Sequence, residues 1–360
     1  MIPQSRHSIT REDIKFVGKA LAGDFLTRGP LTLEFEAKIA ELCGKKYCVT
    51  MANGTVALHA ALLACNAKHV VSPTLTFSAI ANATHFAGAK LYLTDVDSYK
   101  LHATTYSQPL PAKGLVFVPM DYAGLPYNLD SSGLGAGYTT VIRDACHSFG
   151  ATINGESHVK RDDMAVFSFH AIKTISSGEG GCVVTDGEEY ATELRRIRNN
   201  GLENHQQHRF GLNYHMSEIE VALGLSQLKR LDKILERRRE LASKYIEHWA
   251  GQYDRITLPA DDNGHAYHLF VIRLADSVKI KRDTFRRELA DMGIGTQVNY
   301  RPLHRQPIVA SVIDSALTEF PNADWAWERM LSIPLYYGLT DNEQKVVMKA
   351  IDRLLDKHAK

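Results

Sequence analysis

Lys173 lies in a segment whose composition favours a chemical role for its amine. From Ser168 to Gly181 the chain reads Ser-Phe-His-Ala-Ile-Lys-Thr-Ile-Ser-Ser-Gly-Glu-Gly-Gly, and a strand-like run, Cys182 to Thr185, follows. An amine in a restricted, partly apolar pocket has a lowered pKa and can form a Schiff base with an aldehyde. We therefore infer an enzyme with an aldehyde cofactor, for which pyridoxal phosphate is the first candidate.

A second candidate site lies where an expected strand, Tyr47 to Met51, meets an expected helix, Val56 to Cys65. The connection contains Asn53, Gly54 and Thr55. The first N–H groups of a helix are unpaired and carry partial positive charge, so a helix that begins here can bind an anion. Glycine permits close approach and Thr55 adds a hydroxyl donor. A plain helix cap is the alternative, and no Walker pattern follows.

Asp144 is expected at the C-terminal end of an apolar strand that includes Val141 and Ile142. Ligand sites of parallel α/β sheets lie at such strand ends. A carboxylate there could pair with a protonated pyridine nitrogen and keep the ring an electron sink. His147, three residues on, could reach a ring hydroxyl. Taken alone, Asp144 could equally be a turn residue.

Weaker signals come from four other positions. Phe77 follows another expected strand and could stack on a cofactor ring, although a core position is the alternative. Ser168, five residues before Lys173, could donate to a phosphate, and Asn213 caps or precedes a long helix. The polar and aromatic run from Gln297 to His304 suits a phosphorylated or sugar substrate.

Composition bounds the class of protein. The chain has 360 residues, enough for two domains, with 44% hydrophobic and 23% charged residues and a net charge of +1. That charge gives no electrostatic case for nucleic acid or an anionic membrane, and no apolar run approaches a membrane span. Five cysteines and an N-terminus without a signal-peptide core predict reduced thiols in the cytoplasm. No metal-binding motif is found.

Strand-like and helical runs alternate over the first two thirds of the chain, which predicts an α/β fold with a mostly parallel sheet. Thr10 to Asp13 resembles a capping box that opens a helix. A long helix is expected from Ser217 to about Trp249, interrupted near Leu231, with a solvated or interface-rim face at Arg237 to Arg239. Residues 1–240 are predicted to form the large domain and 241–360 a smaller α+β domain.

The ordered combination of these features is more specific than its parts. From about Pro3 to Leu355 the sequence resembles the DegT/StrS-type nucleotide-sugar aminotransferases, which have the fold-type-I pyridoxal phosphate architecture. That resemblance implies a large domain with a mixed, mostly parallel seven-stranded sheet flanked by helices. The matching segments are Leu26–Pro30, Asn53–Thr55, Thr76–Phe77, Asp144–His147, Ser168–Gly181, Asn213–Tyr214, Ala222–Leu228 and Tyr300–His304.

The resemblance also implies roles for single residues. Lys173 would be the catalytic lysine, and L-glutamate the amino donor. The partners would be this donor, a nucleotide sugar and a second copy of the chain in a homodimer, whose Asn213 reaches across the interface. Pyridoxal phosphate would be contacted by Gly54, Thr55, Phe77, Asp144, His147, Ser168, Lys173 and Asn213. The nucleotide sugar would be contacted by Asp24, Phe25, Leu26, Thr27, Asn299, Tyr300, Arg301 and Pro302.

Within that family, the segments Val118–Gly124 and Phe167–Lys173 look most like enzymes of the pseudaminic acid pathway. This implies amination at C4 of a UDP-linked 4-keto-2-acetamido-2,6-dideoxy-L-hexose. A GDP- or dTDP-linked sugar, or amination at C3, stays open, because His215 and Asn299 stand where relatives usually have arginine and histidine. A sugar dehydratase of the same fold, which has histidine in place of the lysine, stays open as well, and so does a non-catalytic binding protein.

Overall fold

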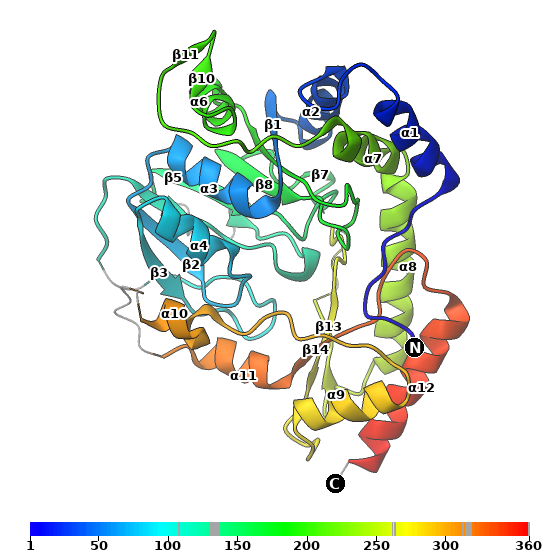
Figure 1. Cartoon of the computed structure of the whole chain (residues 1–360). Coiled ribbons are helices and arrows are strands. Elements are labelled where there is room, and N and C mark those ends of the chain that lie inside the picture. The colour runs from blue at the N-terminus through cyan, green and yellow to red at the C-terminus, as the bar shows by residue number, and fades with distance from the viewer. Residues whose placement is uncertain are drawn as a thin grey trace.

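A seven-stranded sheet forms the centre of the larger part of the molecule (Figure 1). The computed structural model describes residues 1–106, 109–129, 137–260, 262, 264–311, 313 and 319–358. Strand β9 pairs antiparallel with β1 and β8, and the remaining pairs are parallel. The expected mixed, mostly parallel sheet is therefore confirmed. In spatial order its strands are β1 (Tyr47–Met51), β9 (Gly181–Thr185), β8 (Met164–Ser168), β5 (Thr140–Asp144), β4 (Leu115–Phe117), β2 (His69–Pro73) and β3 (Lys90–Thr94).

Helices cover both faces of this sheet because its strands are apolar on both sides. Val166 and Val183 face a core shared with helices α3 (Gly54–Ala64), α4 (Ala79–Phe86) and α6 (Glu188–Arg198). Their strand neighbours Phe167 and Val184 face a second core, shared with α2 (Pro30–Cys43), α7 (Glu218–Leu228) and α8 (Leu231–Trp249). The result is a three-layer α/β/α arrangement.

The expected helix signals are found in the structure. Thr10 and Asp13 form a reciprocal capping box at the start of α1 (Arg11–Leu21). Helix α2 ends at Gly44, which adopts the left-handed conformation with φ of 64°. The long helix is interrupted as expected, because α7 ends at Leu228 and α8 begins at Leu231. No helix among the described residues is both long enough and apolar enough to span a membrane.

The last third of the chain builds a second sheet and core. Strands β12 (Ile256–Thr257), β13 (Phe270–Leu274) and β14 (Met330–Ile333) pair antiparallel. The second half of α8 packs on this sheet. Residue 240, where the large domain was predicted to end, lies inside this continuous helix. The predicted domain boundary there stays a prediction. The accompanying helices are α9 (Arg282–Asp291), α10 (Pro307–Ala310), α11 (Pro321–Arg329) and α12 (Asp341–Lys357).

Short elements complete the described structure. Two small hairpins pair β6 (Thr152–Ile153) with β7 (Glu156–Ser157), and β10 (Leu202–Glu203) with β11 (Gln206–Gln207). At the N-terminus, Ile2 bridges to Ile294. The first residues therefore contact the last third of the chain.

The expectation of a solvated arginine face on α8 is wrong for Arg238. Its side chain is buried, and Nη1 donates to the carbonyls of Tyr267, His268 and Leu335 at 3.1 to 3.4 Å. Burial lowers the pKa of Arg238 to about 10. The helical turn directs Arg238 toward the second sheet, whereas Arg237 and Arg239 stay partly exposed. A run of three arginines therefore does not lie on one face.

Candidate active site

Three chain segments that are distant in sequence converge at one edge of the large sheet. Asp144 ends strand β5, Ser168 ends the neighbouring strand β8, and Gly54 begins helix α3. A Cβ placed on Gly54 would lie 3.0 Å from Cβ of Ser168 and 3.1 Å from Sγ of Cys146. Only a glycine fits this close approach without displacing its neighbours. The structure therefore brings together Gly54, Ser168 and the turn after Asp144.

The start of helix α3 provides donors for an anion. The side chain of Asn53 accepts a hydrogen bond from the N–H of Val56 at 3.0 Å and so caps the helix. The preceding N–H groups, those of Gly54 and Thr55, have no carbonyl partner within the helix. They lie at the positive end of the helix, with the hydroxyl of Ser168 next to Gly54. This arrangement fits a phosphate group.

Lys173 lies in a tight turn after Ser168. Its N–H donates to the carbonyl of His170 at 2.9 Å, and the N–H of Ser177 donates to the carbonyl of Phe169 at 2.8 Å. Burial lowers the pKa of the Lys173 amine, and this effect exceeds the opposing influence of Cys146 and Asp144. Among the described residues none accepts a hydrogen bond from the amine. Lys173 is therefore a partly buried amine whose nitrogen has no partner among the described residues and is left for a bound group.

Asp144 supplies a buried carboxylate to the same region. Its Oδ1 accepts a hydrogen bond from the N–H of Cys146 at 3.2 Å. Burial raises the pKa of the Asp144 carboxyl, while the hydrogen bonds from Cys146 and the charge of Lys173 act in the opposite direction. A cationic group bound beside Asp144 would stabilise its charged form, so the residue fits a partner such as a protonated ring nitrogen.

Aromatic side chains surround His147. Its Nε2 lies 2.9 Å from the hydroxyl of Tyr300, and the ring of Tyr300 lies 5.3 Å from that of Phe77, centroid to centroid. The rings of His147 and His268 are 4.4 Å apart. Burial, together with nearby positive charges that include Lys173, holds the pKa of each of these two histidines well below its usual value. Both imidazoles are therefore neutral at pH 7.

The Nδ1 atoms of His147 and His268 are buried and have no hydrogen-bond partner among the described residues. Buried polar atoms are normally paired, so these two nitrogens fit a polar group of a bound molecule or a water. His268 was not among the residues predicted for the site. The alternation from Tyr267 to Leu274 marks a strand, and no local signal shows that its first residues contact His147.

The residues predicted to bind the nucleotide sugar fall into two groups. Residues 24–27 are exposed, and the carbonyl of Leu26 accepts a hydrogen bond from the N–H of Glu218 at the start of α7 at 3.0 Å. Asn299, by contrast, is 9% exposed, and its Oδ1 accepts a hydrogen bond from Ser332 Oγ at 2.8 Å. Its amide oxygen is thus already used inside the protein.

Arg301 and Pro302 differ in the same way. The Arg301 guanidinium is exposed and lies 5.8 Å from the ring centre of Trp327, whereas Pro302 is buried. Asn213 is exposed, and within the described part of this chain no hydrogen bond or ion pair joins it to Lys173. The single chain therefore assembles the residues around Lys173 and leaves Asn213 and residues 24–27 on the surface. The predicted roles of these residues stay predictions.

The fold and the site define a family. The model of the DegT/DnrJ/EryC1/StrS aminotransferase family matches residues 7–352, nearly the whole chain. The chain therefore belongs to this family of aminotransferases. The family resemblance inferred from the sequence is confirmed, as is the fold-type-I architecture.

Individual relatives cover the chain almost completely. The uncharacterized protein MJ1066 of Methanocaldococcus jannaschii is 31% identical over 379 residues, which span 99% of this chain and 98% of that protein. Helicobacter pylori PseC, an aminotransferase involved in the biosynthesis of pseudoaminic acid, has a similar structure, with a TM-score of 0.91 at 23% identity and 99% coverage of both chains. The sugar aminotransferase CalS13 of Micromonospora echinospora has a TM-score of 0.86 at 26% identity, covering 98% of this chain and 100% of the other.

Proposed function

We propose that this enzyme uses pyridoxal phosphate to move an amino group from L-glutamate to the C4 keto group of a nucleotide-linked 4-keto-6-deoxy sugar. Aminotransferases of this family use pyridoxal phosphate. The observation that carries the proposal is the partly buried amine of Lys173, whose charge acts on the buried carboxylate of Asp144. A lysine nucleophile and an acidic partner for a ring nitrogen are the two groups that this cofactor requires.

The residues of the site fit the cofactor. Its phosphate would be held by the N–H groups of Gly54 and Thr55 and by the hydroxyl of Ser168. Asp144 would pair with the ring nitrogen, and the partnerless Nδ1 of His147 offers a polar contact for the ring hydroxyl. The exposed ring of Phe77 would cover one face of the cofactor. When bound, pyridoxal phosphate supplies an electron sink that makes the amino-bearing carbon acidic.

Lys173 is then the base of the reaction. Its lowered pKa keeps a larger fraction of the amine neutral near pH 7 than an exposed lysine would have. A neutral Nζ can accept the proton from the amino-bearing carbon of glutamate and later return a proton at C4 of the sugar.

Gly181 allows the phosphate-binding turn to pack against strand β9. A Cβ on Gly181 would lie 2.6 Å from the carbonyl carbon of Asn53 and 2.7 Å from the nitrogen of Gly54. Backbone atoms cannot yield as a flexible side chain does. We expect Gly181→Ala to raise the dissociation constant of pyridoxal phosphate at least about tenfold and to cost about 1–3 kcal/mol of folding free energy.

Fluorescence titration of the apoprotein and urea unfolding measure these two quantities. The matched control is Gly18→Ala in helix α1, where a Cβ meets no atom within 4 Å. This change is expected to leave cofactor binding unchanged and to stabilise the helix by about 0.5–1 kcal/mol. Equal cofactor affinity in the Gly181 variant and the wild type would show that this turn does not bind the phosphate.

A homodimer would complete the site. Asn213 and residues 24–27 are exposed in the single chain, and apolar side chains stand exposed beside them. Among these side chains are Leu21, Phe25, Leu26, Leu33, Phe210 and Leu212. Burial of such a surface against a second copy would place its Asn213 at the phosphate and would form the nucleotide-sugar pocket. We place this dimer in the cytoplasm, in keeping with five cysteines that are all unpaired.

The proposed acceptor is UDP-4-keto-2-acetamido-2,6-dideoxy-L-hexose. Its support is the likeness of Val118–Gly124 and Phe167–Lys173 to pseudaminic-acid-pathway enzymes, together with an overall fold shared with PseC. GDP- and dTDP-linked sugars and C3 amination are the alternatives. Lys173 itself favours transamination over dehydration, because dehydratases of this fold carry histidine at that position.

A substrate screen tests this function. The purified protein with pyridoxal phosphate and glutamate is offered UDP-, GDP- and dTDP-linked 4-keto sugars, and mass spectrometry detects the aminated product. We expect formation of the UDP-4-amino sugar together with an equal amount of 2-oxoglutarate, and none of either with Lys173→Ala. A preferred GDP- or dTDP-linked acceptor would overturn the substrate assignment. Loss of water from the sugar without 2-oxoglutarate would overturn the reaction class.

A further inference from the structure

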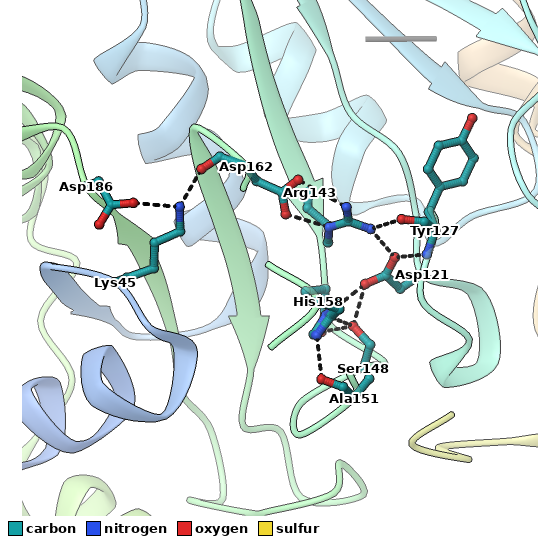
Figure 2. A network of polar contacts seen from close by, with 10 residues as sticks. Lys45, Asp121, Tyr127, Arg143, Ser148, Ala151, His158, Asp162 and Asp186 are labelled. Atoms are coloured by element: carbon teal, nitrogen blue, oxygen red, sulfur yellow. Dashed lines mark hydrogen bonds and ion pairs between the residues drawn. The ribbon is translucent and has the colours of Figure 1, made fainter. Parts of the chain in front are cut away.

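A network of buried charges lies next to the turn that follows strand β5 (Figure 2). Arg143, the residue before Asp144, donates from Nε and Nη2 to the two carboxylate oxygens of Asp162 at 2.6 and 3.0 Å. Its Nη1 donates to Asp121 Oδ1 at 2.8 Å and to the carbonyl of Tyr127 at 2.7 Å. The three charged side chains are at most 2% exposed. Their charges must therefore be balanced inside the protein.

Asp121 joins this network to the turn. Its Oδ2 accepts a hydrogen bond from Ser148 Oγ at 2.6 Å and lies 3.0 Å from His158 Nε2. Its backbone N–H donates to the carbonyl oxygen of Asp144 at 3.1 Å. Asp121 therefore contacts both residues that flank the turn, the end of strand β5 on one side and Ser148, which follows His147, on the other.

The contacts of His158 require a proton on both ring nitrogens. Nδ1 lies 2.9 Å from the carbonyl oxygen of Ala151, which can only accept. Nε2 lies between the carboxylate of Asp121 and Ser148 Oγ, the latter at 2.8 Å. The single hydroxyl proton of Ser148 is needed for its 2.6 Å contact with Asp121, because two bare oxygens repel each other at that distance. Nε2 must therefore donate as well.

We propose that His158 is a buried imidazolium and that, with Asp121 and Ser148, it positions the turn that presents Asp144 and His147 to the cofactor. The cluster is then neutral, since Arg143 and His158 supply two positive charges and Asp121 and Asp162 two negative ones. With a neutral His158 the cluster would keep one uncompensated negative charge in the protein interior, which is costly.

Two further observations agree with this charge count. Burial alone would raise the pKa of Asp121. The charges of Arg143 and His158 nevertheless hold this pKa well below its usual range, so the carboxyl is ionised. Lys45 donates to the backbone carbonyl of Asp162 at 2.6 Å, but its charge is offset by Asp186 Oδ2 at 2.9 Å (Figure 2). Lys45 therefore adds no net charge to the cluster.

The charge count predicts that the effects of two single substitutions partly cancel when they are combined. His158→Gln leaves one excess negative charge and Asp121→Asn one excess positive charge. The double variant retains only the neutral pair of Arg143 and Asp162. We expect each single change to raise the dissociation constant of pyridoxal phosphate about tenfold, by analogy with metal sites, where loss of a residue that orients a ligand costs about 10–100-fold in affinity. In the double variant the dissociation constant should rise clearly less than a hundredfold, which is the product of the two single effects. The reason is that the second change cancels the charge left by the first.

Cofactor titration and urea unfolding of the wild type, the two single variants and the double variant provide two independent double-mutant cycles. Nitrogen NMR of histidine-labelled wild type measures the protonation of His158 directly. The His158 signals are assigned by their loss in His158→Gln. We expect two protonated ring nitrogens at pH 7. The control is His248→Gln, which breaks a surface contact with Asp352 at 2.8 Å and should leave cofactor affinity unchanged.

Single effects that multiply in the double variant, or a His158 with one protonated nitrogen, would overturn the proposal. That the cluster positions Asp144 and His147 for the cofactor rests on the proposed function. The charge state of the cluster does not. A protein that binds no pyridoxal phosphate would refute the function, and the unfolding cycle and the NMR spectrum would still decide the protonation of His158. The spectrum of the wild type also decides it if a variant fails to fold.

Discussion

Lys173→Ala is expected to lower the rate of transamination at least about a thousandfold, because under the proposed function it removes both the attachment point of the cofactor and the base. The variant should also lose the visible absorbance that the wild type shows with pyridoxal phosphate. Its free energy of unfolding should be unchanged or higher, because a partly desolvated amine that donates to no described residue costs stability to keep. Initial rates of 2-oxoglutarate release and urea unfolding measure the two effects.

The control for this prediction is Lys38→Ala. Lys38 is exposed on helix α2 and contacts Glu34 at 3.0 Å. A surface pair of this kind contributes about 0–1 kcal/mol, so neither activity nor absorbance should change. Retention of more than a tenth of the wild-type rate in Lys173→Ala would exclude Lys173 as the catalytic base.

Arg143→Met is expected to destabilise the protein by about 3–5 kcal/mol, since removal of one partner leaves buried carboxylates without compensation. The two carboxylates are those of Asp121 and Asp162, which Arg143 contacts at 2.8 and 2.6 Å. Methionine keeps most of the side-chain volume, so the loss reports on charge and not on a cavity. The free energy of unfolding in urea measures it.

The surface counterpart is Arg305→Met. Arg305 contacts Asp324 at 2.7 Å with 42% of its side chain exposed, so its loss should cost no more than about 1 kcal/mol. A similar cost for both variants would mean that water enters the Arg143 cluster. A large cost for Arg143→Met alone would show that the two buried carboxylates depend on Arg143 for charge compensation.

That Gly54 and Asp144 lie at the same end of the sheet could be predicted from a general property of sheets. Parallel strands end at the same edge, so a polar residue at the end of one strand meets polar residues at the ends of its neighbours. Apolar runs located the strands before Gly54 and at Asp144, whereas the place of Ser168 beside them was implied only by the family resemblance. The seven-stranded sheet was predicted on a different ground, because the order of the segments resembled a known family.

The contacts of His268, Arg238 and His158 could not be predicted in this way. Each residue meets partners from a distant segment: His268 meets His147, and Arg238 meets Leu335. Local periodicity describes which side of an element a residue occupies, but not which remote backbone carbonyl or ring lies opposite. For Arg238 the neighbouring arginines also disguised its buried position.

The hydrogen bond between Tyr300 and His147 limits how this enzyme can be recombined with its relatives. The bond joins the part of the chain beyond helix α8 to the turn of strand β5 at 2.9 Å. A chimera that takes residues 1–240 from this chain and the remainder from a relative would keep the Lys173 turn intact. It would nevertheless leave Nε2 of His147 without its partner unless the donor relative supplies a hydroxyl at the same place. Exchange of the C-terminal portion therefore preserves the contact of His147 only when the incoming segment carries a matching hydroxyl.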